Sequence, residues 1–165
     1  MTRDRPPRPS APAGCVIDAS VPMPWCFADE ASVFTEALLD TLADQRLWAP
    51  ALWVLECANG LQSAQRRRRI DAPRRAEIAL ERSSCQCASI QLSVRIDPEP
   101  PDFISIDRLA AGHELSAYDA AYLELALRRA LPLVSLDAKL LAAAQRLGHP
   151  VVTAPKASPA SGRPS

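Results

Sequence analysis

Four acidic residues are the candidates for chemistry in this sequence. Asp18 follows a short β-branched run, and Asp137 follows a second apolar run. Asp119 lies at the start of a helical pattern, whereas Glu56 is the only charged residue in an apolar helical pattern. Carboxylates held close together raise each other's pKa, so they stay ionised only with a cation nearby. Their oxygens suit Mg²⁺ or Mn²⁺ better than zinc, and such an ion activates water against a phosphodiester.

Each acid also has a structural interpretation. Asp18 and Asp137 are typical turn or helix-cap residues, and Asp119 completes a capping box with Ser116. Glu56 fits such an account least well, because burying an unpaired carboxylate costs several kcal/mol or raises its pKa. A partly exposed Glu56, or one paired with an Arg elsewhere in the chain, stays open. The local sequence does not separate these alternatives.

Three polar residues are placed to support these acids. Ser20 lies two residues after Asp18. Ser135 points to the same side of its strand as Asp137 and can hydrogen-bond a metal-bound water. Asn59 lies one helical step from Glu56 and can orient it. The two histidines stand next to glycines in predicted loops, where neither is placed as a base.

The elements that must position these residues alternate along the chain. Apolar runs predict short strands at 15–17, 47–49, 93–96, 133–135 and 151–152. Helical patterns and their boundary residues predict helices at 31–44, 50–69, 73–88, 102–111, 116–130 and 137–147. Strands that alternate with helices indicate an α/β fold, a parallel sheet covered on both faces. Ligands bind such sheets beyond the carboxyl ends of the strands.

Length and composition indicate one domain. The chain has 165 residues, and its Pro-rich ends at 1–13 and 154–165 are expected to be disordered, which leaves a domain at 14–153. No apolar run approaches the ~20 residues of a membrane span, and the start does not resemble a secretory signal, so a cytoplasmic protein is expected. Five cysteines, an odd number, indicate reduced thiols, three of them in apolar stretches that predict core positions. Cys85 and Cys87 lack further zinc ligands nearby.

Four segments in order resemble the successive motifs of the PIN domain, and in particular the VapC-type toxins of bacterial toxin–antitoxin pairs. They are Val-Ile-Asp-Ala-Ser at 16–20, Leu-Glu-Cys-Ala-Asn-Gly-Leu at 55–61, Leu-Ser-Ala-Tyr-Asp-Ala-Ala-Tyr at 115–122 and Leu-Val-Ser-Leu-Asp-Ala-Lys-Leu-Leu at 133–141. The resemblance covers about 14–152. The eighteen residues from Asp119 to Asp137 also fit the family.

This resemblance implies a three-layer α/β/α fold with a central parallel sheet of four to five short strands. It implies an endoribonuclease that needs Mg²⁺ or Mn²⁺ and cleaves structured RNA such as transfer or ribosomal RNA. A homodimer is implied, inhibited by a small VapB-like antitoxin whose tail fills the acidic groove. By motif, the acidic metal site consists of Asp18, Glu56, Asp119 and Asp137, with Asn59 and Ser135 in support. Pro22 and Pro24 depart from the family, which usually has an uninterrupted helix there.

A run of four arginines closes the helical pattern that contains Glu56. It consists of Arg66, Arg67, Arg68 and Arg69. The run is either a solvated helix end, where cations favour the dipole, or a surface that contacts RNA phosphates. The sequence leaves both interpretations open.

Two alternatives to a nuclease also remain open. One is a catalytically silent PIN-like scaffold that keeps its acids as caps. The other is a phosphoryl-transfer domain with Asp18 as nucleophile, which would want a second Asp at the position of Ser20.

Overall fold

A six-stranded sheet forms the centre of the fold. The computed structural model describes residues 14–26, 33–43, 45–83, 86–87 and 90–152. The strand order is β3-β4-β2-β1-β5-β6, and every neighbouring pair except β3 and β4 is parallel. The strands are β1 (Cys15–Ile17), β2 (Leu47–Ala49), β3 (Gln86–Cys87), β4 (Ile90–Ile96), β5 (Leu133–Val134) and β6 (Val151–Val152). Five parallel strands confirm the predicted sheet.

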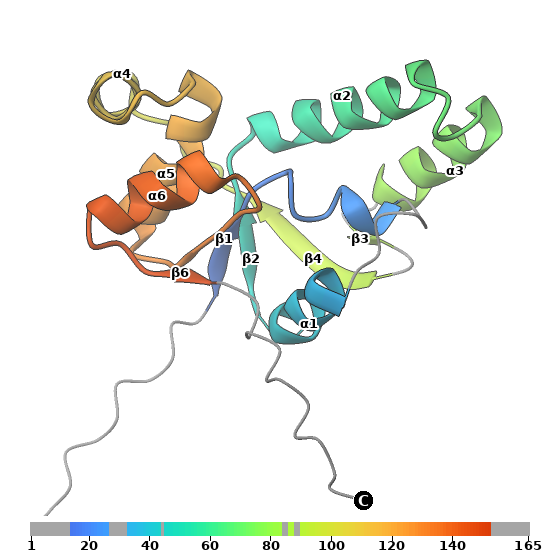
Figure 1. Ribbon diagram of the computed structural model, residues 1–165, viewed down its shortest axis with the longest axis horizontal. Coiled ribbons are helices and arrows are strands. Elements are labelled where there is room, and N and C mark those ends of the chain that lie inside the picture. Colours follow the sequence, from blue (N-terminus) through green and yellow to red (C-terminus); the bar gives the residue numbers. More distant parts are fainter. Residues whose placement is uncertain (1–13, 27–32, 44, 84–85, 88–89, 153–165) are drawn as a thin grey trace, which may run out of the picture.

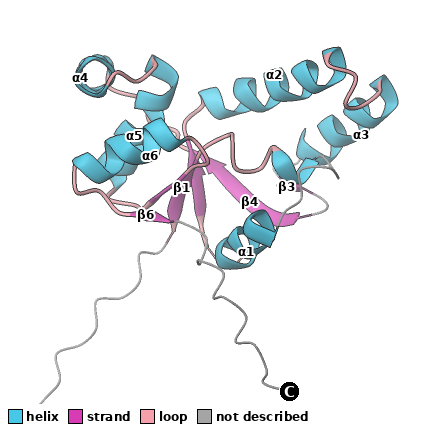
Figure 2. Ribbon diagram, in the orientation of Figure 1, coloured by secondary structure: helices cyan, strands magenta, loops and turns pink. Residues whose placement is uncertain are grey.

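Six α-helices and one 3-10 helix surround the sheet in the described part of the chain (Figure 2). They are η1 (Pro24–Cys26), α1 (Val33–Leu42), α2 (Leu52–Arg66), α3 (Ala72–Ser83), α4 (Phe103–His113), α5 (Ala117–Arg129) and α6 (Ala138–Arg146). All six predicted α-helices are present. None of the described helices is long and apolar enough to cross a membrane. The predicted tails at 1–13 and 154–165 lie outside the described residues.

The prediction is wrong at residues 86–87 and 90–92. The helix expected at 73–88 ends at Ser83, and the chain then forms the antiparallel pair of β3 and β4. The strand expected at 93–96 begins at Ile90 instead. Apolar residues at 90, 92, 94 and 96 alternate with polar ones, which is the two-residue period of a strand. This alternation is stronger than the helical pattern that the prediction extended into it.

The two faces of the sheet carry separate apolar layers. Along β1, Cys15 and Ile17 pack in a cluster with Leu38 and Leu42 of α1. Val16 points to the opposite face and packs in the cluster that contains the buried residues of α5 and α6. Figure 1 shows α1 on one side of the sheet and α5 with α6 on the other. Helix α4 packs against α5. The three-layer α/β/α prediction is therefore confirmed.

Helices α2 and α3 form an arm beyond the sheet (Figure 1). A third apolar cluster joins this arm to η1 through Cys26, Leu61, Ala64 and Ile78. The prolines at 22 and 24 stand in turns and the 3-10 helix rather than in an α-helix, as their positions predict. The three cysteines predicted to be core residues are buried: Cys15, Cys26 and Cys57.

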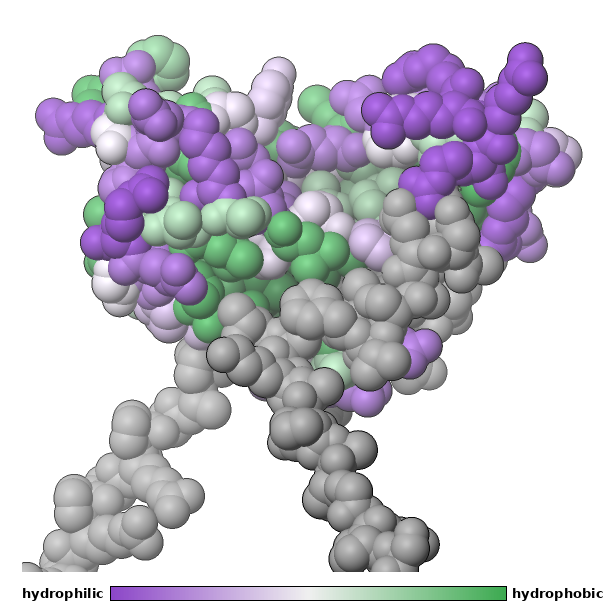
Figure 3. Space-filling view, in the orientation of Figure 1, coloured by the Kyte–Doolittle hydropathy of each residue, from purple (hydrophilic) through white to green (hydrophobic). Residues whose placement is uncertain are grey.

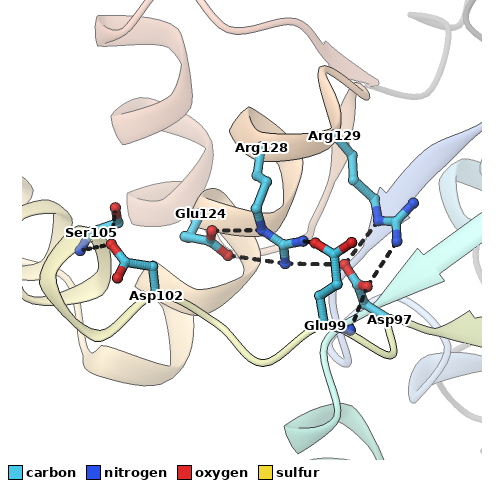
Figure 4. A network of polar contacts seen from close by, with 7 residues as sticks. All are labelled: Asp97, Glu99, Asp102, Ser105, Glu124, Arg128 and Arg129. Carbon is cyan, nitrogen blue, oxygen red and sulfur yellow. Dashed lines mark hydrogen bonds and ion pairs between the residues drawn. The ribbon is translucent and has the colours of Figure 1, made fainter.

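An ion-pair network fixes the end of β4 to the end of α5 (Figure 4). Asp97 follows β4, and its side chain is only 1% exposed. Its two carboxylate oxygens each accept a hydrogen bond of 2.8 Å from the guanidinium of Arg129. Arg128 binds Asp97 at 3.1 Å and also pairs with Glu124 and Glu99, each at 2.8 Å. These side chains hold the carboxyl edge of β4 against α5.

Candidate active site

Asp18 lies at the carboxyl end of β1 and is buried, with 6% exposed. Its Oδ2 atom accepts hydrogen bonds from the Ser20 hydroxyl at 2.5 Å and from the Ser135 hydroxyl at 2.7 Å. Ser20 Oγ accepts a further bond from the backbone N–H of Leu136 at 3.0 Å. Burial raises the pKa of Asp18, and the hydroxyl groups that bond it offset part of that rise. The negative charge of Asp119 raises the same pKa further.

Glu56 is held by a tyrosine from another helix. The phenol of Tyr122 on α5 donates a short hydrogen bond to Glu56 Oε2. Burial raises the pKa of the Glu56 carboxyl, the bond from Tyr122 lowers it, and the negative charges of Asp18 and Asp119 raise it. The pKa of Tyr122 is raised, first by its burial and then by its bond to Glu56. Glu56 is therefore half-buried beside two other carboxylates and keeps a protein partner for its charge.

Tyr122 is the site residue that sequence reasoning missed. The spacing of Tyr118 and Tyr122 predicts two packing residues. Tyr122 does pack and is fully buried, but its hydroxyl also bonds Glu56, whereas Tyr118 is 63% exposed. A signal was present, because a tyrosine in the middle of an apolar helix needs a partner for its hydroxyl when buried. Tyr122 lies three residues after Asp119, so the two side chains are on the same face of the helix.

If the chain cleaves RNA, as the resemblance implies, replacing Tyr122 by Phe is expected to slow cleavage while preserving the fold. The packing of the ring stays, but Glu56 loses its tether, and a displaced carboxylate lowers kcat on the order of tenfold. The free energy of unfolding should fall by about 1 kcal/mol. Steady-state RNA cleavage and urea unfolding measure both. Tyr118→Phe is the matched control, since Tyr118 is 63% exposed on the same helix. Equal kcat in the two variants would show that the tether does not act on catalysis.

Asp119 combines a cap with a place in the acidic cluster. Its backbone N–H donates to Ser116 Oγ at 3.1 Å, and the Ser116 hydroxyl donates to Asp119 Oδ2 at 2.7 Å. The predicted capping geometry at the start of α5 is confirmed. The same carboxylate raises the pKa of both Asp18 and Glu56, so it lies within electrostatic range of each. The capping interpretation is therefore confirmed, and a role of Asp119 as a metal ligand stays a prediction.

Asp137 is the N-cap of α6. Its Oδ1 atom accepts hydrogen bonds of 2.8 Å from the backbone N–H groups of Lys139 and Leu140. Its own backbone N–H donates to Ser135 Oγ at 2.9 Å, and Ser135 in turn bonds Asp18. Asp137 is exposed, and its charge is not among the causes that shift the pKa of Asp18 or Glu56. Among the described residues, Asp137 is thus connected to Asp18 through Ser135.

Two substitutions separate the cap from a role in chemistry at Asp137. Asp137→Ala removes the acceptor and should lower the free energy of unfolding by about 1 kcal/mol, whereas Asp137→Asn keeps it within about 0.5 kcal/mol. If the negative charge of Asp137 also takes part in RNA cleavage, Asp137→Asn should cleave RNA at least about tenfold more slowly than the wild type, although its fold is intact. Thermal unfolding and cleavage rates test this pair. Cleavage by Asp137→Asn at the wild-type rate would show that Asp137 acts only as the helix cap.

The described residues bring together three of the four predicted acids. Asp18, Glu56 and Asp119 come from the end of β1, from α2 and from α5; the charge of Asp119 raises the pKa of the other two, and the charge of Asp18 raises that of Glu56. Within the described part of the chain, no group of three or more His, Cys, Asp or Glu side chains already has the arrangement of a metal site. The cluster is an acidic centre at the carboxyl edge of the sheet. In Figure 3 the surface is hollowed between the part that carries α4 and the part that carries α2 and α3.

Asn59 does not meet Glu56 in the way its spacing suggests. It is exposed on α2, and the hydrogen bond that holds Glu56 comes from Tyr122 instead. A supporting role for Asn59 therefore stays a prediction.

The arginine run lies at the far end of α2, away from the acidic centre. Arg66 is the last residue of the helix, Arg67 is its C-cap, and Arg68 and Arg69 follow in the turn. All four are exposed. The backbone N–H of Arg67 still bonds the Ser63 carbonyl at 3.0 Å, but Arg68 has a left-handed backbone with a φ of 58°. This turn directs the chain toward α3.

The helix predicted at 50–69 is therefore too long at its end. It stops at Arg66, so Arg67, Arg68 and Arg69 are not helical as the prediction had them. An arginine in the sequence does not indicate a residue with left-handed backbone, because glycine or asparagine usually takes that position at the end of a helix. The exposure of the run is compatible with both a solvated helix end and an RNA contact, and the RNA contact stays a prediction.

Fold and site together define an α/β/α domain with an acidic centre beyond a parallel sheet. The comparison with protein families matches residues 15–147 to the PIN domain. No curated protein matches the chain. Among solved structures, the crystal structure of PAE2754 from Pyrobaculum aerophilum is similar in fold, with a TM-score of 0.55 and 24% sequence identity over 87% of this chain and 88% of that chain.

The chain belongs to the PIN domain family. PIN domains are typically nucleases that use divalent metal ions and act on RNA. The family assignment from the four ordered motifs is therefore confirmed.

Proposed function

We propose that this chain is a metal-dependent endoribonuclease whose acidic centre is the active site. The observation that carries the proposal is the electrostatic proximity of three carboxylates from three separate elements. The charge of Asp119 raises the pKa of Asp18 and of Glu56, and the charge of Asp18 raises that of Glu56, at the edge of the sheet where ligands bind. A protein that needed these residues only for folding would gain nothing from gathering like charges.

The donor set fits Mg²⁺ or Mn²⁺. Asp18, Glu56 and Asp119 offer oxygen atoms only, which hard divalent cations prefer. We propose Asp18, Glu56, Asp119 and Asp137 as the residues that would hold the ion. When bound, such an ion activates water and stabilises the charge that develops on a phosphodiester. Ser20 and Ser135 orient Asp18 through its Oδ2 atom, and Tyr122 orients Glu56.

We infer a VapC-like toxin role from the four motifs. The substrate in this proposal is structured RNA such as transfer or ribosomal RNA, and the arginine run at 66–69 contacts phosphates of a flanking stem. Several large apolar side chains are exposed on α2, α4 and α5: Val54, Leu55, Phe103, Ile104 and Tyr118. Such side chains suit a protein partner, here a VapB-like antitoxin or the second subunit of a homodimer. The proposed location is the cytoplasm.

The direct test is cleavage of structured RNA by the purified chain. With Mn²⁺ we expect defined endonucleolytic products, and with EDTA we expect none. Expression of the chain alone should arrest growth, and co-expression with the cognate antitoxin should relieve the arrest. No cleavage under any divalent ion would contradict the enzyme proposal. Cleavage without growth arrest would contradict only the toxin role.

A silent scaffold is the second candidate function. The specific observation in its favour is that Asp119 and Asp137 both act as helix caps, which explains two of the four acids without catalysis. It does not explain why the buried Asp18 and the half-buried Glu56 lie within electrostatic range of Asp119. This candidate predicts RNA or protein binding with no cleavage in the assay above.

A further inference from the structure

The described helices leave one face of the sheet uncovered next to β4. The register places Val16, Trp48 and Arg95 side by side on β1, β2 and β4. Val16 is buried under α5 and α6, whereas Trp48 is half-buried and Arg95 is exposed. The covering helices therefore end over β2, and the outer part of this face presents an indole and guanidinium groups.

Arg129 is held rigidly over Trp48. Its guanidinium carbon lies 3.9 Å from the centre of the indole ring, and that of Arg95 lies 5.9 Å away. Asp97 fixes Arg129 by two parallel bonds of 2.8 Å, as Figure 4 shows. A guanidinium that is stacked and bidentately bonded loses little freedom when it meets a further anion.

A cavity of about 410 Å³ lies beside this stack, lined by Arg46, Trp48, Glu99, Arg128, Arg129 and Leu131. Arg128 and Arg129 are paired with carboxylates. Arg46 lines the cavity and Arg95 lies against the same indole; both are exposed and have no ion pair within the described part of the chain. The cavity therefore has two guanidinium groups that are already paired with carboxylates, those of Arg128 and Arg129. Two more, those of Arg46 and Arg95, lack an anionic partner among the described residues.

We propose that this cavity binds the phosphate backbone of RNA, at a site separate from the acidic centre. The inference rests on the proposed ribonuclease function. Unpaired guanidinium groups recognise phosphates, and contacts of this type position RNA without reading its sequence. The ring of Trp48 is already covered by Arg129, so the site holds backbone rather than stacked bases. The strongly exposed apolar residues named above are not among its lining residues, which argues against a protein partner here.

The alternative is a surface stack in which long arginine side chains merely cover Trp48. The two accounts differ in the salt dependence of RNA binding. Each phosphate contact releases bound counterions, so log K falls with log salt by roughly 0.7 to 0.9 per contact. Arginines that only cover an indole leave this slope unchanged when they are replaced.

The experiment measures binding of a labelled RNA hairpin to the full chain with Asp18→Asn, which prevents cleavage. Adding Arg46→Ala and Arg95→Ala should weaken binding at least about tenfold at low salt and reduce the slope by about one to two. Arg46→Lys with Arg95→Lys should keep most of the slope because the charge remains. The matched control is Arg108→Ala with Arg146→Ala, which removes the same charge from exposed positions on α4 and α6.

The results separate this site from the catalytic proposal. An unchanged affinity and slope in the Arg46 and Arg95 double variant would overturn the RNA site, even if the wild-type chain cleaves RNA. An equal loss in the control pair would also overturn it, because net charge alone would then explain the effect. Tight RNA binding with the expected loss, but no cleavage by the wild type, would support the site and contradict the enzyme.

Discussion

Asp18→Asn is expected to abolish RNA cleavage, with a loss on the order of a thousandfold. Asp18 is the most buried of the acids at the centre, and its Oδ2 atom is fixed by two serine hydroxyls. An asparagine has nearly the same shape and can accept the same hydrogen bonds, but it brings no negative charge for a cation. The measurement is the initial rate of cleavage with saturating Mn²⁺.

The same substitution should not destabilise the fold. The pKa of Asp18 is raised in the folded chain, chiefly by burial, so its ionised form is less favourable there than in the unfolded chain. This destabilisation is absent below the unfolded pKa and develops as the pH rises through and above it. At pH 7 in EDTA, Asp18→Asn should therefore unfold at an equal or higher urea concentration than the wild type.

The control for Asp18→Asn is Asp40→Asn, the same change at an exposed position on α1. It should keep both activity and stability. A clear loss of stability in Asp18→Asn would mean that the carboxylate serves the fold. Unchanged cleavage in a pure preparation of Asp18→Asn would contradict the catalytic assignment.

Asp97→Asn is expected to produce the largest loss of stability, about 3 kcal/mol of unfolding free energy. The side chain of Asp97 is 1% exposed, and it is the partner of Arg129 and one of the partners of Arg128. Removing its charge leaves the guanidinium of Arg129 without its bidentate partner at the end of β4. Urea unfolding at pH 7 measures the loss.

The control for this network is Glu99→Gln. Glu99 also pairs with Arg128, but its side chain is 68% exposed, so its loss should cost less than about 1 kcal/mol. Equal effects of Asp97→Asn and Glu99→Gln would show that burial does not strengthen the network.

Acid should weaken the fold through the same residue. The bond from Arg129 is the main cause that lowers the pKa of Asp97 from 3.8 to about 2. Because the folded pKa lies below the unfolded one, the stabilisation is present above about pH 4 and is lost as the pH falls toward about 2. Asp97→Asn should therefore show a shallower loss of stability across this acid range than the wild type.

The sequence predicts most of the fold because each element carries its own signal. The strand at 15–17 and the cap at Asp137 are local features, and both are found as predicted. The β3–β4 pair was missed because a two-residue strand such as Gln86–Cys87 has no period of its own. Its pairing depends on a neighbouring strand rather than on local preference.

The site is less predictable than the fold because its contacts are long-range. Residues Glu56 and Tyr122 are 66 positions apart, and Asp97 and Arg129 are 32 apart. No local pattern indicates which buried carboxylate meets which hydroxyl or guanidinium. The order of the acids predicts a common edge of the sheet, but only the folded chain shows that Asp18, Glu56 and Asp119 lie within electrostatic range of one another.

The measurement that tests the central claim most directly is the melting temperature during a Mn²⁺ titration, with Asp18→Asn in parallel. A cation that binds the folded acidic centre must stabilise it in proportion to its occupancy. We predict that the melting temperature of the wild type rises with Mn²⁺ until it saturates, and that Asp18→Asn shows little or no rise. A wild type that does not respond, or a variant that responds equally, would contradict a metal site at these carboxylates.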